Sequence, residues 1–522
     1  MTSKRFLYIA VFISGMTTLA IELSASRLLG SVFGTSNLVW ANVIGLMLLY
    51  LTIGYFIGGR WADRYPYPKT LYLIMLWASF LSALVPLVAR PILQGAARAV
   101  SGVEAGLALG SFASVLILFA VPVTLLGCIS PFAIRLAVQS PEEAGRVSGQ
   151  IYAISTLGSL LGTFLPTLIL IPELGTALTF LTFAGCLYVI AFIGLWSQNG
   201  IKTLLWLWMP VIIIFLAIIV LNGVLRPAPA NSTILYDDES AYNYIQVLRD
   251  SDGYINLRLN EGQGVHSRYH PDKYELAGTW DYFLVAPYFN PSFTTQDMNS
   301  LLVIGLAAGT IPRQYQHVYG NILMDGIEID PDIIHVGELF FDMNTEKMPS
   351  LTAYAEDGRY MLQKLTHKYD VVAIDAYRPP YIPWHLTTVE YFQEVKAKLS
   401  ENGVVAINVG RTSTDRRLVD AMAATLSYVF PSVHAIDVPR SFNTILVATQ
   451  SITTTDNLLQ NLNTLPPETP ELLYKVIQSS LQNLVSIQPS AIIFTDDRAP
   501  IETLVDSLVI NFLLYGDIDS IR

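Results

Sequence analysis

Leu301-Leu-Val-Ile-Gly-Leu-Ala-Ala-Gly309 is the segment that indicates the fold of the C-terminal half. Its first four residues form a continuous apolar run, which is typical of a strand buried on both faces of a parallel sheet. Gly305 and Gly309 then allow a tight turn into a helix. Further strand-like runs lie at 322–329, 351–355, 369–374, 404–409 and 433–448, and helix-like segments lie at 387–400 and 415–429. This alternation predicts a doubly wound α/β domain.

Acidic residues follow the apolar runs of this predicted sheet. Glu328, Asp357 and Asp375 each come where a predicted strand ends. Ligands in doubly wound sheets bind at the carboxyl ends of the strands. Glu328 lies about twenty residues beyond the glycine turn, where a carboxylate accepts the hydroxyls of a ribose. The sequence therefore predicts an adenosine site, while the alternative that these carboxylates only cap helices stays open.

A small β-unit precedes the α/β domain. Two alternating runs, 242–248 and 254–259, are separated by Asp250-Ser-Asp-Gly253, and Asp-Gly between such runs is a strong hairpin signal. The proline-rich stretch before them reads as a linker. The predicted organisation is a membrane domain over 1–225, a linker over 226–235, a β-unit over 236–298 and the α/β domain over 299–522.

The N-terminal part has the composition of a membrane domain. The chain is 52% hydrophobic and only 14% charged, which is far from the composition of soluble proteins. Apolar runs of about twenty residues span a bilayer. Seven such runs predict seven transmembrane helices, at 6–26, 38–59, 70–89, 106–128, 148–171, 174–196 and 203–224. We therefore expect a multi-pass protein of the cell membrane.

The charges of the two halves differ in sign. Residues 1–225 carry eleven Lys and Arg against six Asp and Glu, whereas the remainder carries twenty against thirty-six. A nucleic-acid binder needs a basic face, so nucleic acid is excluded as a partner. The distribution of Lys and Arg between loops predicts that the N-terminus is cytoplasmic. Seven spans would then place the acidic half outside the cytoplasm.

Several catalytic classes lack their motifs. Cys128 and Cys186 both lie in apolar stretches, so no disulfide framework or zinc motif is present. The chain contains no GxxxxGK[ST] phosphate loop and no GxSxG nucleophile elbow. We expect no metal and no prosthetic group.

The order of these features resembles spermidine synthase and its aminopropyltransferase relatives over residues 236–450. The fusion to a multi-span half is similar to bacterial membrane-bound spermidine synthase-like proteins. The resemblance implies the class I methyltransferase-like sheet of that family. It also implies decarboxylated S-adenosylmethionine as co-substrate, with its aminopropyl group passing to an amine and methylthioadenosine leaving. Putrescine, giving spermidine, is the default acceptor, and a homodimer stays open.

The same resemblance implies roles for individual residues. Asp375 falls on the family's catalytic aspartate, and a carboxylate there suits the chemistry because an attacking amine must lose a proton. Donor contacts are implied for Asn243, Gly305, Gly309, Glu328, Asp357 and Gly358. Contacts with the amine substrate are implied for Gln263, Tyr282 and Tyr377.

The chain also departs from the family pattern. Ala308 replaces an aspartate of the glycine loop, Arg378 replaces a second aspartate, and Trp280-Asp-Tyr282 replaces a Tyr-x-Glu that holds the diamine. Arg378 favours an acceptor that bears a carboxylate or phosphate. Two alternatives to aminopropyl transfer therefore stay open. One is methyl transfer from S-adenosylmethionine, and the other is a non-catalytic membrane protein that senses or transports a polyamine or nucleoside.

Overall fold

The computed structural model describes residues 4–33, 37–99, 106–220, 228–260, 264–377, 382–412 and 415–505. The chain divides into two compact units. The first is Met1–Pro227 with Glu239–Ala241, and the second is Ala228–Asp238 with Tyr242–Arg522. The boundaries that the sequence suggested at 225, 235 and 298 stay predictions.

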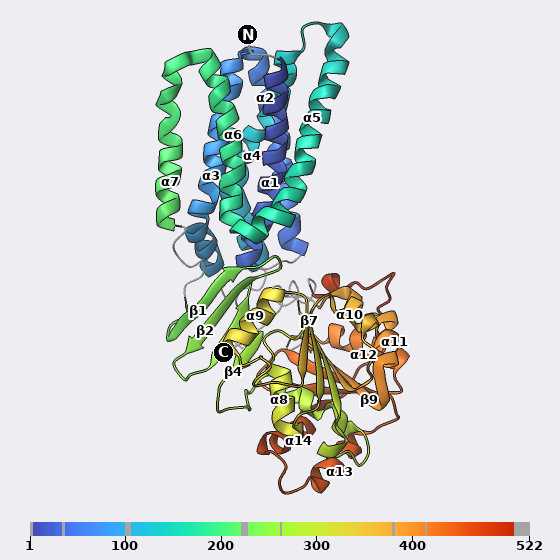
Figure 1. Ribbon diagram of the computed structural model, residues 1–522. Helices are drawn as coiled ribbons and strands as arrows, with labels where there is room; N and C mark the ends of the chain where they lie inside the picture. Colours follow the sequence, from blue (N-terminus) through green and yellow to red (C-terminus); the bar gives the residue numbers. More distant parts are fainter. Residues whose placement is uncertain are drawn as a thin grey trace. The chain divides into compact units, whose positions relative to one another are not determined.

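The first unit is a bundle of long helices that run side by side (Figure 1). Its α-helices are α1 (Lys4–Phe33), α2 (Asn37–Arg64), α3 (Pro68–Ala99), α4 (Gly106–Ala137), α5 (Ala144–Leu165), α6 (Ile171–Asn199) and α7 (Trp208–Val220). Glycines let the helices approach closely. A Cβ atom at Gly158 of α5 would lie 2.0 Å from the carbonyl oxygen of Phe12, and one at Gly54 of α2 would lie 2.3 Å from that of Thr124. Such small-residue contacts are typical of helices packed in a membrane.

Five helical stretches are long and apolar enough to cross a membrane. They are Lys4–Phe33, Asn37–Arg64, Pro68–Leu93, Leu109–Ala137 and the continuous stretch Pro141–Val220. The last stretch has 80 residues and contains α5, α6 and α7, which correspond to the last three predicted spans. Residues 221–224 of the seventh predicted span lie outside the described residues. The bundle therefore has the composition of a multi-pass membrane domain, and the count of seven spans stays a prediction.

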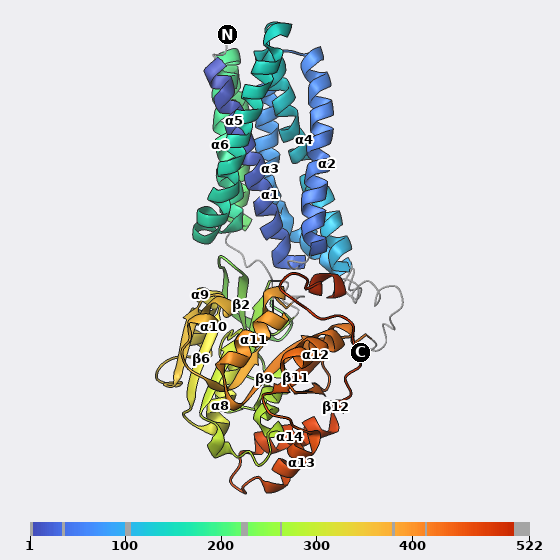
Figure 2. The same ribbon diagram turned by 90° about the vertical axis from the view of Figure 1, so that its right-hand side faces the viewer.

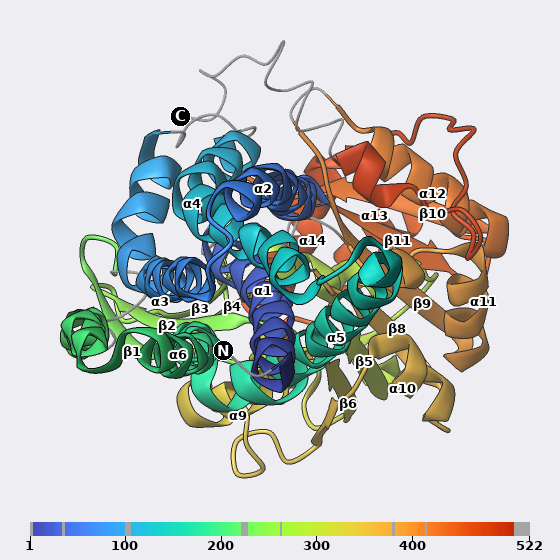
Figure 3. The ribbon, with the colours of Figure 1, turned by 90° about the horizontal axis from the view of Figure 1, so that it is seen from above.

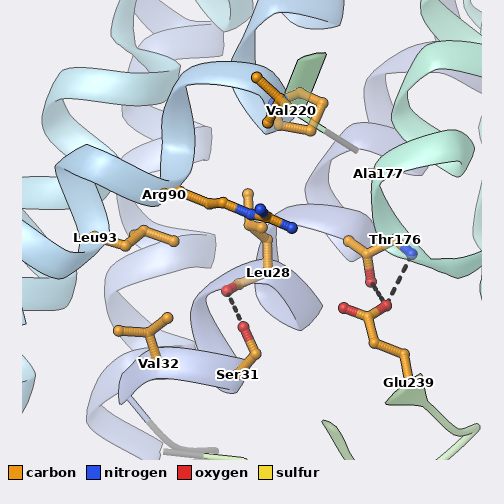
Figure 4. A pocket seen from close by; sticks show the side chains of 10 residues that line it. Leu28, Ser31, Val32, Arg90, Leu93, Thr176, Ala177, Val220 and Glu239 are labelled. Carbon is orange, nitrogen blue, oxygen red and sulfur yellow. Dashed lines mark hydrogen bonds between the residues drawn. The ribbon is translucent and has the colours of Figure 1, made fainter. Parts of the chain in front are cut away.

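The first unit contains a cavity of about 500 Å³, part of it open to solvent. Most of its wall is apolar, and Figure 4 shows Arg90 of α3 pointing into it. On the opposite side, the Glu239 carboxylate accepts hydrogen bonds of 2.9 Å from both the backbone N–H and the hydroxyl of Thr176. Charged groups of both signs thus border an otherwise apolar cavity.

A small antiparallel sheet opens the second unit. Its strands are β1 (Ser232–Glu239), β2 (Tyr244–Asp250), β3 (Ile255–Leu259) and β4 (Ser267–Tyr269), in the order β1-β2-β3-β4. The predicted hairpin is present, and Gly253 sits in its turn with φ +86°. Strand β1 begins at Ser232, inside the stretch that the sequence suggested as a linker, and its Leu235 and Tyr236 pack against the apolar core of the small sheet.

The main sheet has eight strands in the order β12-β10-β11-β9-β8-β5-β6-β7. Figure 3 labels β10, β11, β9, β8, β5 and β6 of this sheet. They are β5 (Ser300–Ile304), β6 (Leu323–Glu328), β7 (Leu351–Ala355), β8 (Tyr369–Ile374), β9 (Leu399–Gly410), β10 (Ser432–Asp437), β11 (Asn443–Thr449) and β12 (Leu484–Val485). Strands β7, β6, β5, β8 and β9 are parallel, and the other pairs are antiparallel. The chain winds outward from β5 through β6 to β7 and then returns to the other side of β5. The predicted doubly wound fold is confirmed.

Helices cover both faces of this sheet. Leu301 and Val303 of β5 belong to the core of one face, whereas Leu302 and Ile304 belong to the core of the other. The second face is covered by α10 (Gly358–Lys364), α11 (Val389–Lys398) and α12 (Arg417–Val429), of which α11 and α12 lie side by side in Figure 2. The remaining helices are α8 (Thr310–Tyr319), α9 (Pro331–Phe340), α13 (Thr455–Thr464), α14 (Glu471–Gln482) and the 3-10 helix η4 (Thr279–Phe289).

One buried hydrogen bond within the sheet allows a test of the core. The Tyr369 hydroxyl donates to Asp325 Oδ2 at 2.6 Å, and Asp325 is only 2% exposed. We predict that Tyr369→Phe lowers the free energy of unfolding of the full chain by about 1–3 kcal/mol, because it removes a hydrogen bond to a buried carboxyl group, to which Tyr354 also bonds.

The matched control is Tyr391→Phe. Tyr391 is equally buried, but its hydroxyl has no hydrogen-bond partner among the described residues. Removal of this hydroxyl should leave the unfolding free energy nearly unchanged or raise it slightly. Denaturant titrations of both variants in detergent measure the difference, and equal losses would contradict the assignment.

Candidate active site

Four predicted site residues meet at the carboxyl edge of the main sheet. Gly305 follows the end of β5, Glu328 ends β6, Asp357 follows β7 and Asp375 follows β8. Ile304 pairs with both Ile327 and Ile374, so the ends of β6, β5 and β8 stand level with one another. Strand order reverses between β5 and β8, which is where doubly wound sheets bind ligands.

The glycine turn packs directly on the backbone of the predicted catalytic residue. Gly305 has φ +85°, and a Cβ atom there would lie 2.6 Å from the backbone nitrogen of Ala376 and from the carbonyl carbon of Asp375. The Asp375 N–H also donates to the carbonyl oxygen of Ile304 at 2.9 Å. A side chain at position 305 would therefore push the two strand ends apart. Gly309, with φ +81°, leaves similar room for Met343.

Glu328 is held beneath the glycine turn by main-chain donors. Its Oε2 accepts a hydrogen bond of 2.9 Å from the Ala307 N–H, and its Oε1 accepts one of 3.2 Å from the Asp330 N–H. Burial raises the pKa of Glu328 to about 7, although these hydrogen bonds oppose the rise. Each carboxylate oxygen keeps a further lone pair. Glu328 can therefore accept additional hydroxyl donors in a fixed orientation.

Asn243 connects the small sheet to the same region. Its Nδ2 donates to Asp330 Oδ2 at 2.8 Å, and Asn260 donates to its Oδ1 at 2.8 Å. Asp330 caps helix α9 and lies two residues beyond Glu328. The structure thus brings Asn243 next to the ribose end of the predicted adenosine site.

Asp357 has two structural partners. Its Oδ1 accepts hydrogen bonds from the N–H groups of Arg359 and Tyr360 and so caps helix α10. Its Oδ2 lies 3.0 Å from Nε2 of His385. The helix-capping alternative is therefore correct for one oxygen of Asp357, while the other faces a histidine. A Cβ atom at Gly358 would lie 2.7 Å from Cγ2 of Ile304, so no larger residue fits there.

Two asparagines that the sequence analysis missed orient Asp375. Asn408 of β9 donates from Nδ2 to Asp375 Oδ1 at 2.9 Å, and Asn443 of β11 donates to Asn408 Oδ1 at 2.8 Å. The second bond fixes the amide of Asn408 so that its NH₂ group faces the carboxylate. Burial raises the pKa of Asp375 to about 7, and the Asn408 hydrogen bond opposes this. The Tyr377 hydroxyl donates to the Asn408 carbonyl oxygen at 3.2 Å.

The other predicted substrate residues are placed differently. Tyr282 of η4 is 8% exposed, and its hydroxyl shares a hydrogen bond of 2.8 Å with Ser479 of α14. Gln263 and Arg378 lie outside the described residues. Ala308 is buried in an apolar cluster with residues of β2 and β3, and its N–H donates to Ser267 Oγ. The position at which the family carries an aspartate is therefore part of the core between the small sheet and α9.

An ion-pair network secures the α10 side of the site. Arg359 pairs with Glu394 at 2.6 Å and with Asp496 at 2.8 Å, and the Thr388 hydroxyl donates to Asp496. The network connects α10, α11 and the segment near the C-terminal end of the described chain. Within the described residues, no group of three or more His, Cys, Asp or Glu side chains could hold a metal ion.

Comparisons with known proteins identify the C-terminal half. Residues 290–454 match the model of the spermine/spermidine synthase domain. A probable polyamine aminopropyl transferase of Bifidobacterium longum is 30% identical over 288 residues, which are 52% of this chain and 62% of the relative. A polyamine aminopropyltransferase of Vibrio vulnificus is 28% identical over 216 residues, which are 40% of this chain and 69% of the relative.

The chain thus spans less than two thirds of the Bifidobacterium relative. Among solved structures, spermidine synthase from Thermotoga maritima is 17% identical, with a TM-score of 0.38 over 48% of this chain and 83% of that chain. The domain match covers strands β5 to β11 and the site residues from Gly305 to Asp375. Residues 290–454 of this chain therefore form a spermine/spermidine synthase domain.

Proposed function

We propose that this chain is a membrane-bound aminopropyltransferase. It moves the aminopropyl group of decarboxylated S-adenosylmethionine to an amine and releases methylthioadenosine. The observation that carries the proposal is the placement of Asp375, whose carboxylate accepts a hydrogen bond from Asn408 and whose backbone packs against Gly305 of the glycine turn. The similarity to polyamine aminopropyltransferases supports the same reaction.

The donor occupies the β5-β6-β7 side of the edge. The ribose hydroxyls bind Glu328, the adenine lies beside Asp357 and Gly358, and the turn from Gly305 to Gly309 passes beneath the donor. Asn243 closes this side through Asp330. No prosthetic group takes part in this arrangement.

Asp375 acts as the base of the reaction. The nitrogen of the neutral acceptor attacks the methylene carbon bonded to the sulfonium, a C–N bond forms and the C–S bond breaks. The bonding electron pair stays on sulfur and gives neutral methylthioadenosine, while the nitrogen's proton passes to Asp375 and then to solvent. Since the donor already carries a good leaving group, orientation of the two reactants supplies much of the rate.

Glu328 is less suited to the role of base, although burial raises its pKa to about 7, the same value as that of Asp375. Both Glu328 oxygens are bonded to main-chain N–H groups at the base of the glycine turn. Among the described residues, Asp375 has a hydrogen-bond partner only on Oδ1. Its Oδ2 is therefore the oxygen that can take a proton from an incoming amine.

Product analysis separates the proposal from its alternatives. With decarboxylated S-adenosylmethionine and an amine, we expect methylthioadenosine and the aminopropylated amine, and putrescine is the first acceptor to test. Release of S-adenosylhomocysteine from intact S-adenosylmethionine would instead indicate methyl transfer. Nucleoside binding without either product would indicate a sensor.

Substitution of the proposed base should separate turnover from binding. We predict that Asp375→Asn lowers kcat by about 10²-fold or more, since it removes the proton acceptor. Binding of methylthioadenosine, measured by calorimetry, should be unchanged. Glu328→Gln is the matched variant and should weaken that binding by about tenfold, because it weakens hydrogen bonds to the ribose. Undiminished turnover in Asp375→Asn would exclude it as the base.

The pH profile should report the raised pKa of Asp375. Only the ionised form accepts a proton, so we predict that the rate rises with pH up to about 7 as Asp375 loses its proton. The Asn408 hydrogen bond lowers this pKa, and Asn408→Leu should therefore move the profile to higher pH. The ionisation of the acceptor amine affects both proteins equally. The difference between the two pH–rate profiles therefore reports the change in the pKa of Asp375. A profile of Asn408→Leu that moves to lower pH would contradict the assignment of Asp375 as the titrating base.

The side of the membrane provides a further test. The donor is a small molecule that we expect only in the cytoplasm, whereas seven spans and a cytoplasmic N-terminus place the second unit outside. Because turnover requires the donor, the proposed function predicts a cytoplasmic reporter after Arg522, against the topology that the span count and the loop charges predict. An external reporter would favour the sensor and would rule out turnover of the cytoplasmic donor.

A further inference from the structure

We propose that the acceptor amine carries an anionic group at its far end and that Arg440 recognises this group. The inference rests on the aminopropyl transfer proposed above and names the substrate class of the same site. It follows from the direction in which the acceptor must lie and from the charges found there.

The acceptor side of the site lies over β8, β9 and β11. The donor occupies the ends of β5, β6 and β7, and Asp375 stands at the end of β8, so the acceptor approaches from the opposite side. Ile374 pairs with Ile407, which places Asp375 next to Asn408 of β9. From there a series of hydrogen bonds runs through Asn443 to Ser441, in the turn between β10 and β11. That turn therefore borders the space beyond the base.

Arg440 is the exposed cation of this turn. It has φ +55°, a conformation that residues other than glycine rarely adopt, and it forms no ion pair among the described residues. Such strained positions concentrate at functional sites. Burial raises the pKa of Tyr282, and the charge of Arg440 is one of the effects that oppose this rise. The charge of Arg440 thus acts on Tyr282, the residue that stands at the family's diamine-holding position.

The surroundings of Arg440 add positive rather than negative charge. Arg411 directly follows β9, its side chain is 13% exposed, and it donates to the Ser441 carbonyl oxygen at 3.3 Å. Its Nε lies 3.3 Å from Asp437 Oδ1. Arg416 binds the same carboxylate at 2.7 Å. Arg411 and Arg416 therefore share the Asp437 carboxylate, and Arg440 adds a third positive charge to the same turn region.

This charge balance selects against a diamine. The second ammonium of putrescine would lie in a region with excess positive charge, and the acids by which the family holds it are replaced by Ala308 and Tyr282. A carboxylate at the same distance from the reacting nitrogen would instead be attracted to Arg440, whose planar guanidinium suits it. Exchange of a like charge for an opposite charge near Arg440 changes the affinity for the acceptor by about tenfold or more.

Two acceptors of equal length test the inference. Putrescine and 4-aminobutanoate present the same amine and differ at the far end in the sign of the charge. With the full chain in detergent and decarboxylated S-adenosylmethionine as donor, kcat/KM is measured for both by mass spectrometry of the products. We expect wild type to prefer 4-aminobutanoate, and Arg440→Glu to shift the ratio toward putrescine by about tenfold or more.

Lys368→Glu is the matched control. Lys368 is exposed and precedes the first residue of β8, at the opposite edge of the sheet, so the same charge reversal there should leave the ratio unchanged. Arg440→Gln should shift the ratio less, in the same direction. This variant provides the test if Arg440→Glu impairs folding. A wild-type preference for putrescine, or a ratio that Arg440 variants do not move, would overturn the inference and leave aminopropyl transfer intact. If no amine yields methylthioadenosine, both the anionic acceptor and aminopropyl transfer itself are ruled out.

Discussion

The close contact between two strand ends governs the site of this protein. The main chain of Gly305 lies against the peptide that joins Asp375 to Ala376, with no space for a Cβ atom between them. This contact can form only where the first strand of the doubly wound sheet meets the fourth, because there the chain leaves β5 on one side and returns on the other. It brings the glycine turn, which we propose passes beneath the nucleoside, and the carboxylate of Asp375, which we propose is the base, next to each other. The remaining site residues are arranged around it.

Glu328 and Asp375 are both desolvated, but they differ in their hydrogen-bond partners. The pKa values of Glu328 and Asp375 are both raised to about 7 by burial. Main-chain N–H groups occupy both oxygens of Glu328, which makes it a fixed acceptor for hydroxyls. Among the described residues, only the amide of Asn408 bonds the Asp375 carboxylate, so one oxygen is left for proton transfer. Similar desolvation combined with different hydrogen-bond partners therefore suits Glu328 to the binding role and Asp375 to the role of base that we propose.

The sequence predicted the sheet well because each of its parallel strands is a short apolar run followed by a polar residue. Gly305, Glu328, Asp357 and Asp375 could be predicted as candidates for the same reason, since each ends such a run or lies within two residues of its end. Asn408 and Asn443 could not, because they lie 33 and 35 residues from their partners and only strand register brings them together. The contact of Asp357 with His385 was also hidden, since 28 residues separate the two, whereas helix capping by Asp357 was one of the alternatives. Helices α13 and α14 and strand β12 were missed because their apolar residues are interrupted by many polar ones.

The most direct test of the central claim is an experimental structure of the full chain with bound methylthioadenosine. The account predicts that the ribose hydroxyls contact Glu328, that the adenine lies beside Asp357 and Gly358, and that the sulfur faces Asp375. A nucleoside bound elsewhere, or one whose sulfur points away from Asp375, would contradict it.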